Sequence, residues 1–216
     1  MFTLYYYHDP MCSWCWGYRP TAELLFSKLP ENVSLENVLG GLAPDDHEPM
    51  SVEMRATISG HWKRIQEMLG TEFNFDFWRI CDPRRSTYPA CRAVIAASKQ
   101  NREEDMILAI QRAYYLRAMS PSDPGTLEQL AQELELDVTN FDIDLRSAET
   151  ETALQQQIAH SRSAPIQGFP ALALHNGHHL APVHLDYRNH EVTLRHLQAL
   201  MLAEYWQPGQ ASLLKL

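Results

Sequence analysis

The first residues of the chain, Phe2 to Tyr7 ("FTLYYY"), are apolar, aromatic or β-branched and carry no charge. A short run of this kind without polar alternation predicts a β-strand that is buried on both faces. His8-Asp9-Pro10 follows it. Proline cannot donate a backbone hydrogen bond to a neighbouring strand, so Pro10 is expected to end the strand.

The next apolar residues keep helical spacing. They predict a helix over residues 13–29, ended by Pro30 and kinked at Pro20. A second strand is predicted within residues 32–42, with Gly40-Gly41 at its end. This strand–helix–strand order predicts two parallel strands joined by a crossover helix.

From residue 51 to residue 162 the period of the apolar positions is that of helices alone. Val52, Met54, Ile58, Trp62 and Ile65 follow one helical face. Further helical stretches follow with capping residues at their starts, among them Ser86-Thr87 and Thr126. This part of the chain is therefore expected to be an all-helical domain.

Alternation typical of strands returns at "GFPALALHNGHHL". Residues 171–175 are predicted to form a strand, and Asn176-Gly177 is the usual signal for a two-residue type I′ hairpin turn. A closing amphipathic helix is predicted over residues 191–206.

Without the helical segment, the order of elements is β-α-β followed by β-β-α, which is that of the α/β thioredoxin fold. The predicted domain bounds are 1–50 and 163–216 for the two parts of this fold and 51–162 for the all-helical domain inserted between the second and third core strands.

Cys12-Ser13-Trp14-Cys15 stands where the first helix is expected to begin. Free N–H groups and the positive end of the helix dipole favour a thiolate there. The pKa of Cys12 is therefore expected to be lowered, to somewhere within roughly 3.5–7.5. Cys15 lies one turn further into the helix and is expected to stay a buried thiol. Two close thiols of unequal acidity are what disulfide exchange requires, one as nucleophile and one as resolving thiol.

Two other interpretations of the pair stay open. A lone C-x-x-C is half of a tetrahedral zinc site, but no second C-x-x-C follows, and Cys81 and Cys91 are separated by nine residues on helical ground. The pair could also be an accident of composition. Its position before a helix favours the redox interpretation, and we expect no bound metal.

Charge and composition narrow the class of protein. The 216 residues carry a net charge of −9, which argues against a nucleic-acid or anionic-membrane surface. No apolar run is long enough to span a membrane, and the start lacks the charged and apolar regions of a secretory signal. A cytoplasmic location is expected, where four cysteines are more typical of catalysis or metal binding than of structural disulfides.

Pro170 begins the strand that is expected to face the cysteine pair. Thioredoxin-like folds usually carry a cis-proline at this place, so the Phe169-Pro170 bond is predicted to be cis. The backbone of Phe169 would then face the cysteines and be free to bind a substrate backbone.

These features together resemble the DsbA-like branch of the thioredoxin superfamily, and most closely its cytosolic FrnE-like oxidoreductases. The resemblance spans the whole chain and is carried by "DPMCSWCWG", "YPACRAV" and "GFPALAL". It implies thiol–disulfide oxidoreductase activity, with Cys12 as nucleophile, Cys15 as resolving thiol and Pro170 beside the substrate. Protein or small-molecule thiols and disulfides are the implied partners.

The chain departs from its relatives in places. Ser13-Trp14 is neither the Pro-His nor the Gly-Pro of better-known members, so the redox potentials of those members do not transfer to this chain. Ser13, Phe169 and an exposed Trp14 are expected to contact substrate. Many relatives bury a carboxylate in the first strand, where this chain has tyrosines, so proton transfer to Cys15 falls to water, His8 or Asp9.

A glutathione-dependent transferase or isomerase of the kappa-class type is the alternative function. Those enzymes share the architecture but typically have serine where Cys12 stands. Cys12 counts against that class without excluding glutathione as a co-substrate.

Overall fold

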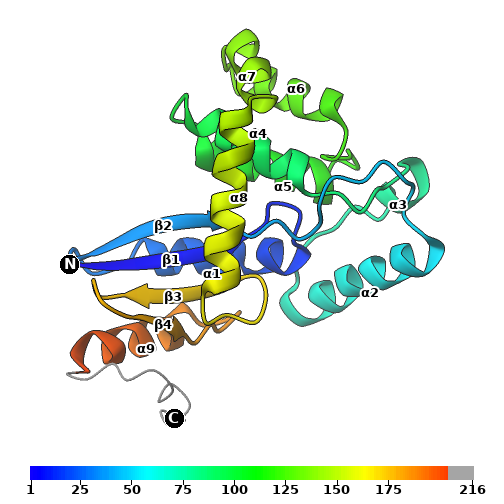
Figure 1. Ribbon diagram of the computed structural model, residues 1–216. Helices are drawn as coiled ribbons and strands as arrows, with labels where there is room; N and C mark the ends of the chain where they lie inside the picture. The colour runs from blue at the N-terminus through cyan, green and yellow to red at the C-terminus, as the bar shows by residue number, and fades with distance from the viewer. Residues whose placement is uncertain (204–216) are drawn as a thin grey trace.

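The computed structural model describes residues 1–203, and its centre is a four-stranded sheet in the order β2-β1-β3-β4 (Figure 1). β1 (Phe2–His8) pairs parallel with β2 (Val33–Leu39) and antiparallel with β3 (Ala171–His175), and β3 pairs antiparallel with β4 (Leu180–Val183). This is the thioredoxin-like α/β fold that the order of elements predicts.

The central strand β1 is covered on both faces, as its uninterrupted apolar run predicts. On one face Leu4 and Tyr6 pack against α1 (Ser13–Phe26) and α9 (His190–Leu202). On the other face the rings of Tyr5 and Tyr7 contact His160 of α8 (Ala148–Ser163). The end of β1, where the cysteine pair follows, is thereby held between two helical layers.

All the helices between β2 and β3 belong to the insertion. The bounds of those before α8 are Val52–Leu69 for α2, Phe77–Ile80 for α3, Tyr88–Ser98 for α4, Glu103–Tyr115 for α5, Pro124–Glu133 for α6 and Val138–Leu145 for α7. Helices α4 to α7 gather beyond one edge of the sheet, and α8 returns the chain across the sheet face (Figure 1). The predicted domain bounds at residues 50 and 162 stay predictions.

An aromatic cluster holds α2, α3 and α5 together. Trp62 of α2 is fully buried and contacts the rings of Phe73, Phe75, Phe77, Trp78, Tyr114 and Tyr115. α2 also lies close against α1 at Gly17, where a Cβ would come within 2.7 Å of a methyl carbon of Ile65. The insertion is thus packed directly against the helix that carries the cysteines.

The β3–β4 hairpin forms as predicted, but the predicted turn type is wrong. A type I′ turn needs positive φ at both Asn176 and Gly177, and only Gly177 has it. The strands instead pair up to His175 and Leu180, which leaves a four-residue loop. The side-chain oxygen of Asn176 accepts the N–H groups of His178 and His179, at 3.0 and 2.8 Å, and this bonding closes the longer loop.

Two helix ends differ from the sequence predictions. The first helix ends at Phe26 rather than at residue 29, and Pro20 lies inside it. The last helix ends at Leu202, and the remainder of its predicted range, 204–206, lies outside the described residues. Among residues 1–203, none of the helices has the length and apolar character needed to cross a bilayer.

Candidate active site

Cys12 occupies the N-cap position of α1, where its backbone is extended at φ −80° and ψ 114°. The preceding turn sets this position, since the N–H of Cys12 donates to the carbonyl of Asp9 at 2.9 Å and the N–H of Trp16 donates to the carbonyl of Cys12 at 3.1 Å. The sulfur therefore lies at the helix N-terminus, as the sequence predicts. Cys12 as a whole is only 6% exposed.

Cys15 lies one turn further along α1 and is 1% exposed. Its thiol is free and lies within hydrogen-bonding reach of the Cys12 sulfur. Burial raises the pKa of Cys15 well above its usual range, and the hydrogen bond with Cys12 and the charge on that sulfur raise it further. Cys15 therefore stays protonated at neutral pH until a base or a reaction step removes its proton.

The loop before β3 brings Phe169 to the cysteine pair. The Phe169-Pro170 peptide bond is cis, as predicted, and the Cys12 thiol donates to the Phe169 carbonyl at 3.5 Å. The Phe169 ring lies over Gly40 at the end of β2, where a Cβ would come within 1.9 Å of the ring. Residues more than 150 positions apart thus share one site.

A groove of about 250 Å³ opens above the Cys12 sulfur. Cys12, Ser13, Trp14 and Phe169 line it, together with residues of α2 and of the segment before α4. The prediction that Trp14 is exposed holds only in part, because Trp14 is partly buried: its ring packs edge-on against Tyr187, and the Arg64 guanidinium lies 5.8 Å from the ring centroid.

Asp9, one of the two residues proposed for proton transfer, is fully buried beneath the Cys12 turn. Its carboxylate accepts hydrogen bonds from the N–H groups of Met11 and Leu42, each at 2.8 Å, and from the Thr87 hydroxyl at 2.7 Å. The Cys91 thiol donates to the same carboxylate at 3.7 Å. Burial raises the pKa of Asp9, and these hydrogen bonds oppose the rise.

This carboxylate ties the cysteine turn to α4 of the insertion, a contact that the sequence does not reveal. The sequence marks Thr87 only as a candidate cap, yet in the structure its side chain makes no cap hydrogen bond within α4 and bonds Asp9 instead. The segment "YPACRAV" is the one signal that marks this region. Cys91 and Cys81 are both free thiols, and Cys81 donates to the Ala118 carbonyl at 3.0 Å.

His8, the other residue proposed for proton transfer, is 1% exposed and stacks on Tyr6 with ring centroids 5.1 Å apart. Within residues 1–203 its Nε2 atom has no hydrogen-bond partner. His8 and Cys15 both line a cavity of about 40 Å³, together with Arg19, Glu23 and Glu104 among others. Burial, with a smaller effect of Arg19, lowers the pKa of His8 to about 4.

No group of three His, Cys, Asp or Glu side chains in the described part of the chain is placed to hold a metal ion. Of the four cysteines, Cys12 and Cys15 lie together, while Cys81 and Cys91 each lie in separate surroundings.

Comparison with known proteins agrees with this geometry. A family model described as thioredoxin matches residues 5–192. The chain belongs to the thioredoxin family. Its helical insertion lies between β2 and β3. This thioredoxin-family protein shares its fold with several solved structures described as DsbA proteins or DsbA oxidoreductases, at 13% to 18% identity.

Two solved structures cover nearly the whole of this thioredoxin-family chain. A candidate protein disulfide isomerase from Nitrosomonas europaea is 28% identical, with a TM-score of 0.82 over 94% of this chain and 99% of that one. The cytosolic disulfide reductase DsbM from Pseudomonas aeruginosa is 24% identical, with a TM-score of 0.75 over 93% and 100% of the two chains.

Among curated proteins, the ClpXP adapter protein SpxH from Bacillus subtilis is 24% identical over 179 residues. The match takes in 82% of this chain and 59% of SpxH, so the chain spans about three fifths of the length of that relative.

Proposed function

We propose that this protein is a thiol–disulfide oxidoreductase of the DsbA-like kind, nearest to the cytosolic FrnE-like branch. One observation carries the proposal: the Cys12 sulfur lies at the start of α1, 3.5 Å from the Phe169 carbonyl, with the Cys15 thiol within reach. This arrangement supports Cys12 as the nucleophile, Cys15 as the resolving thiol and the Phe169 backbone as the place where substrate lies.

The reaction takes two exchanges. The Cys12 thiolate attacks one sulfur of a substrate disulfide, forms a mixed disulfide and releases the other sulfur as a thiolate. Cys15 then loses its proton and attacks the Cys12 sulfur, which forms the Cys12–Cys15 disulfide and releases the second substrate thiolate. Two electrons pass from the cysteine pair to the substrate, and the two released thiolates take up protons. The reverse sequence oxidises a substrate dithiol.

The direction follows from the cytoplasmic location that we propose. In a glutathione poise of roughly −220 to −320 mV the cysteine pair is expected to rest as the dithiol, which favours reduction or isomerisation of substrates over oxidation. Equilibration of the protein with glutathione buffers, followed by alkylation and mass measurement, tests this. A two-electron Cys12–Cys15 couple within about that range is expected, because a couple well below it would rest as the disulfide. A potential near −120 mV contradicts the proposed direction, and the absence of any couple contradicts the function.

We also propose that His8, rather than Asp9, accepts the Cys15 proton, directly or through water in the shared cavity. The Nε2 atom of His8 has no hydrogen-bond partner within the described residues, and His8 lines the same small cavity as Cys15. Asp9 instead has its carboxylate filled by hydrogen bonds. A space of about 40 Å³ holds water, which needs roughly 10–15 Å³ per molecule.

The His8→Gln variant tests this role. His8, with its pKa near 4, is a neutral base from about pH 5 upward, so decay of the wild-type mixed disulfide is expected to change little with pH between pH 5.5 and 7.5. In the variant the same step is expected to be about 100-fold slower at pH 6 and to rise in proportion to hydroxide. Rapid quench-flow with acid measures the rate of each of the two exchange steps separately. His175→Gln, at the end of β3 and outside the cavity, is the matched control. If the pH profile of His8→Gln runs parallel to that of the wild type, His8 does not accept the proton.

The SpxH relatives support a second candidate function, a protein-binding adapter in which the fold holds a partner without exchanging disulfides. The SpxH match from Bacillus subtilis takes in 82% of this chain. In an adapter, binding of the partner persists in the Cys12→Ala variant. In the oxidoreductase that we propose, stable capture of a partner requires the Cys12 sulfur.

A further inference from the structure

The groove above Cys12 has a charge opposite to that of the whole protein. The chain carries a net charge of −9. Among the described residues, however, the groove is lined by two arginines, Arg84 and Arg85, and by His61, with no aspartate or glutamate. A cationic lining in an acidic protein attracts anionic ligands toward the reactive sulfur.

The two arginines differ in what they already bind. Arg84 forms an ion pair with Asp123 and donates to the Ser122 carbonyl at 2.8 Å. Arg85 is partly buried and, within residues 1–203, makes no ion pair or side-chain hydrogen bond. It lies close enough to Tyr114, another residue of the groove, for its charge to oppose the rise in the Tyr114 pKa that burial causes. Arg85 is therefore a cation whose donors are available to a ligand.

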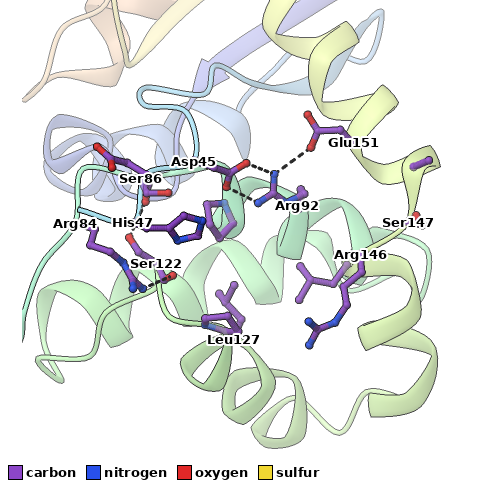
Figure 2. Close-up of a pocket in the computed structure, with 15 residues that line it drawn as sticks. Asp45, His47, Arg84, Ser86, Arg92, Ser122, Leu127, Arg146, Ser147 and Glu151 are labelled. Carbon is purple, nitrogen blue, oxygen red and sulfur yellow. Dashed lines mark hydrogen bonds and ion pairs between the residues drawn. The ribbon is translucent and has the colours of Figure 1, made fainter. Parts of the chain in front are cut away.

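The arginines of a second cavity differ from Arg85 in this respect. The cavity of about 580 Å³ in Figure 2 contains Arg84, Arg92 and Arg146. Figure 2 shows Arg92 bonded to Asp45 and Glu151, and Arg146 pairs with Asp142. Each cation there has an acidic partner, so this larger space has no comparable free charge among the described residues.

The rest of the groove strengthens the effect of Arg85. Methionine and aliphatic side chains, Met11, Leu42, Met50, Met54 and Ile58, form much of the wall. Such a lining displaces water, and a charge pair is stronger where less water surrounds it. With a volume of about 250 Å³, the groove accommodates a small thiol or a few residues of a peptide around its cysteine.

We infer that the groove selects thiols and disulfides that carry a carboxylate a few bonds from the sulfur, and that Arg85 binds this carboxylate while Cys12 attacks the disulfide. The inference rests on the proposed oxidoreductase function and specifies its substrates. The source of the carboxylate is either a small peptide thiol such as glutathione or an acidic residue beside the cysteine of a protein substrate.

The test compares three disulfides of different charge: oxidised glutathione, which is also much the largest, bis(2-hydroxyethyl) disulfide and cystamine. Second-order rate constants for oxidation of the reduced protein are measured at low and high salt, each divided by the rate constant for dithiothreitol with the same disulfide. The wild type is expected to favour glutathione disulfide over the neutral disulfide by about tenfold, as a charge-assisted hydrogen bond allows, and to lose much of this preference in high salt.

Two substitutions locate the preference. Arg85→Gln is expected to lower the ratio of the glutathione to the neutral rate constant about tenfold, and Arg85→Glu is expected to bring cystamine above glutathione. Arg79→Gln is the matched control, because Arg79 is well exposed, pairs with Asp76 and lies outside the groove. Peptide disulfides with Glu or Lys beside the cysteine show whether an acidic protein segment is selected in the same way.

The outcomes separate this inference from the proposed function. Reaction with all three disulfides at similar normalised rates, or a ratio that Arg85→Gln leaves unchanged, overturns the charge selection and leaves the oxidoreductase intact. Failure of the wild type to react even with the neutral disulfide overturns the oxidoreductase itself, and the substrate selection with it.

Discussion

The Cys15→Ser variant is expected to stop after the first exchange, with its substrate held on Cys12 through a disulfide that nothing in the site resolves. The reason is the pairing seen in the structure: the only thiol placed against the Cys12 sulfur among the described residues is that of Cys15. Serine keeps the size of the side chain and cannot form the second disulfide. Turnover with a disulfide substrate is expected to fall by at least about 1,000-fold, a loss of roughly 4 kcal/mol in transition-state stabilisation.

Mass spectrometry of the acid-quenched protein under non-reducing conditions measures the trapped species and identifies the partner. Cys12→Ser is expected to be equally inactive without trapping anything, since the attacking sulfur is missing. Cys81→Ser is the matched control, because Cys81 is also a free thiol but bonds Ala118 instead. Turnover that survives in Cys15→Ser favours the glutathione-dependent transferase, in which one cysteine position is sufficient.

The Asp9→Ala variant is expected to lose about 3–5 kcal/mol of unfolding free energy. The substitution removes a fully buried carboxylate and leaves the N–H groups of Met11 and Leu42 and the Thr87 hydroxyl without their acceptor. Each buried donor left unpaired costs about 1–3 kcal/mol, so several together exceed a typical single substitution. Urea denaturation followed by tryptophan fluorescence measures the loss.

Asp46→Ala is the control for this effect. Asp46 also accepts one backbone N–H, that of Glu48, but it is exposed and lies outside the Cys12 turn. A change of no more than about 0.5 kcal/mol is expected there. If Asp9→Ala proves as mild as Asp46→Ala, the Asp9 carboxylate does not hold the cysteine turn against α4.

Local patterns in the sequence were sufficient for the elements that carry the cysteines and for the order in which they follow one another. The apolar run of β1 and the helix that begins beside Cys12 depend on backbone preferences within a few residues. The cis bond before Pro170 was instead predicted from the order of elements along the whole chain. The presence of the β3–β4 hairpin also followed from local backbone preferences, but the type and length of its turn did not. The choice between a two-residue and a four-residue loop depends on how β4 pairs and packs, and Asn176 can bond its own backbone in either case.

The surroundings of the two sulfurs were decided by packing between segments far apart in the chain. Asp9 meets Thr87 across 78 positions, Cys12 meets Phe169 across 157, and Arg85 reaches the groove from the segment before α4. The sequence alone therefore determined which residues are chemically able to react and where a helix would begin beside them. Only the tertiary structure decided that the Asp9 carboxylate accepts several hydrogen bonds, while the Nε2 atom of His8 and the guanidinium of Arg85 have no hydrogen-bond partner among the described residues. The physical reason is that burial and hydrogen-bond partners depend on neighbours that local sequence does not specify.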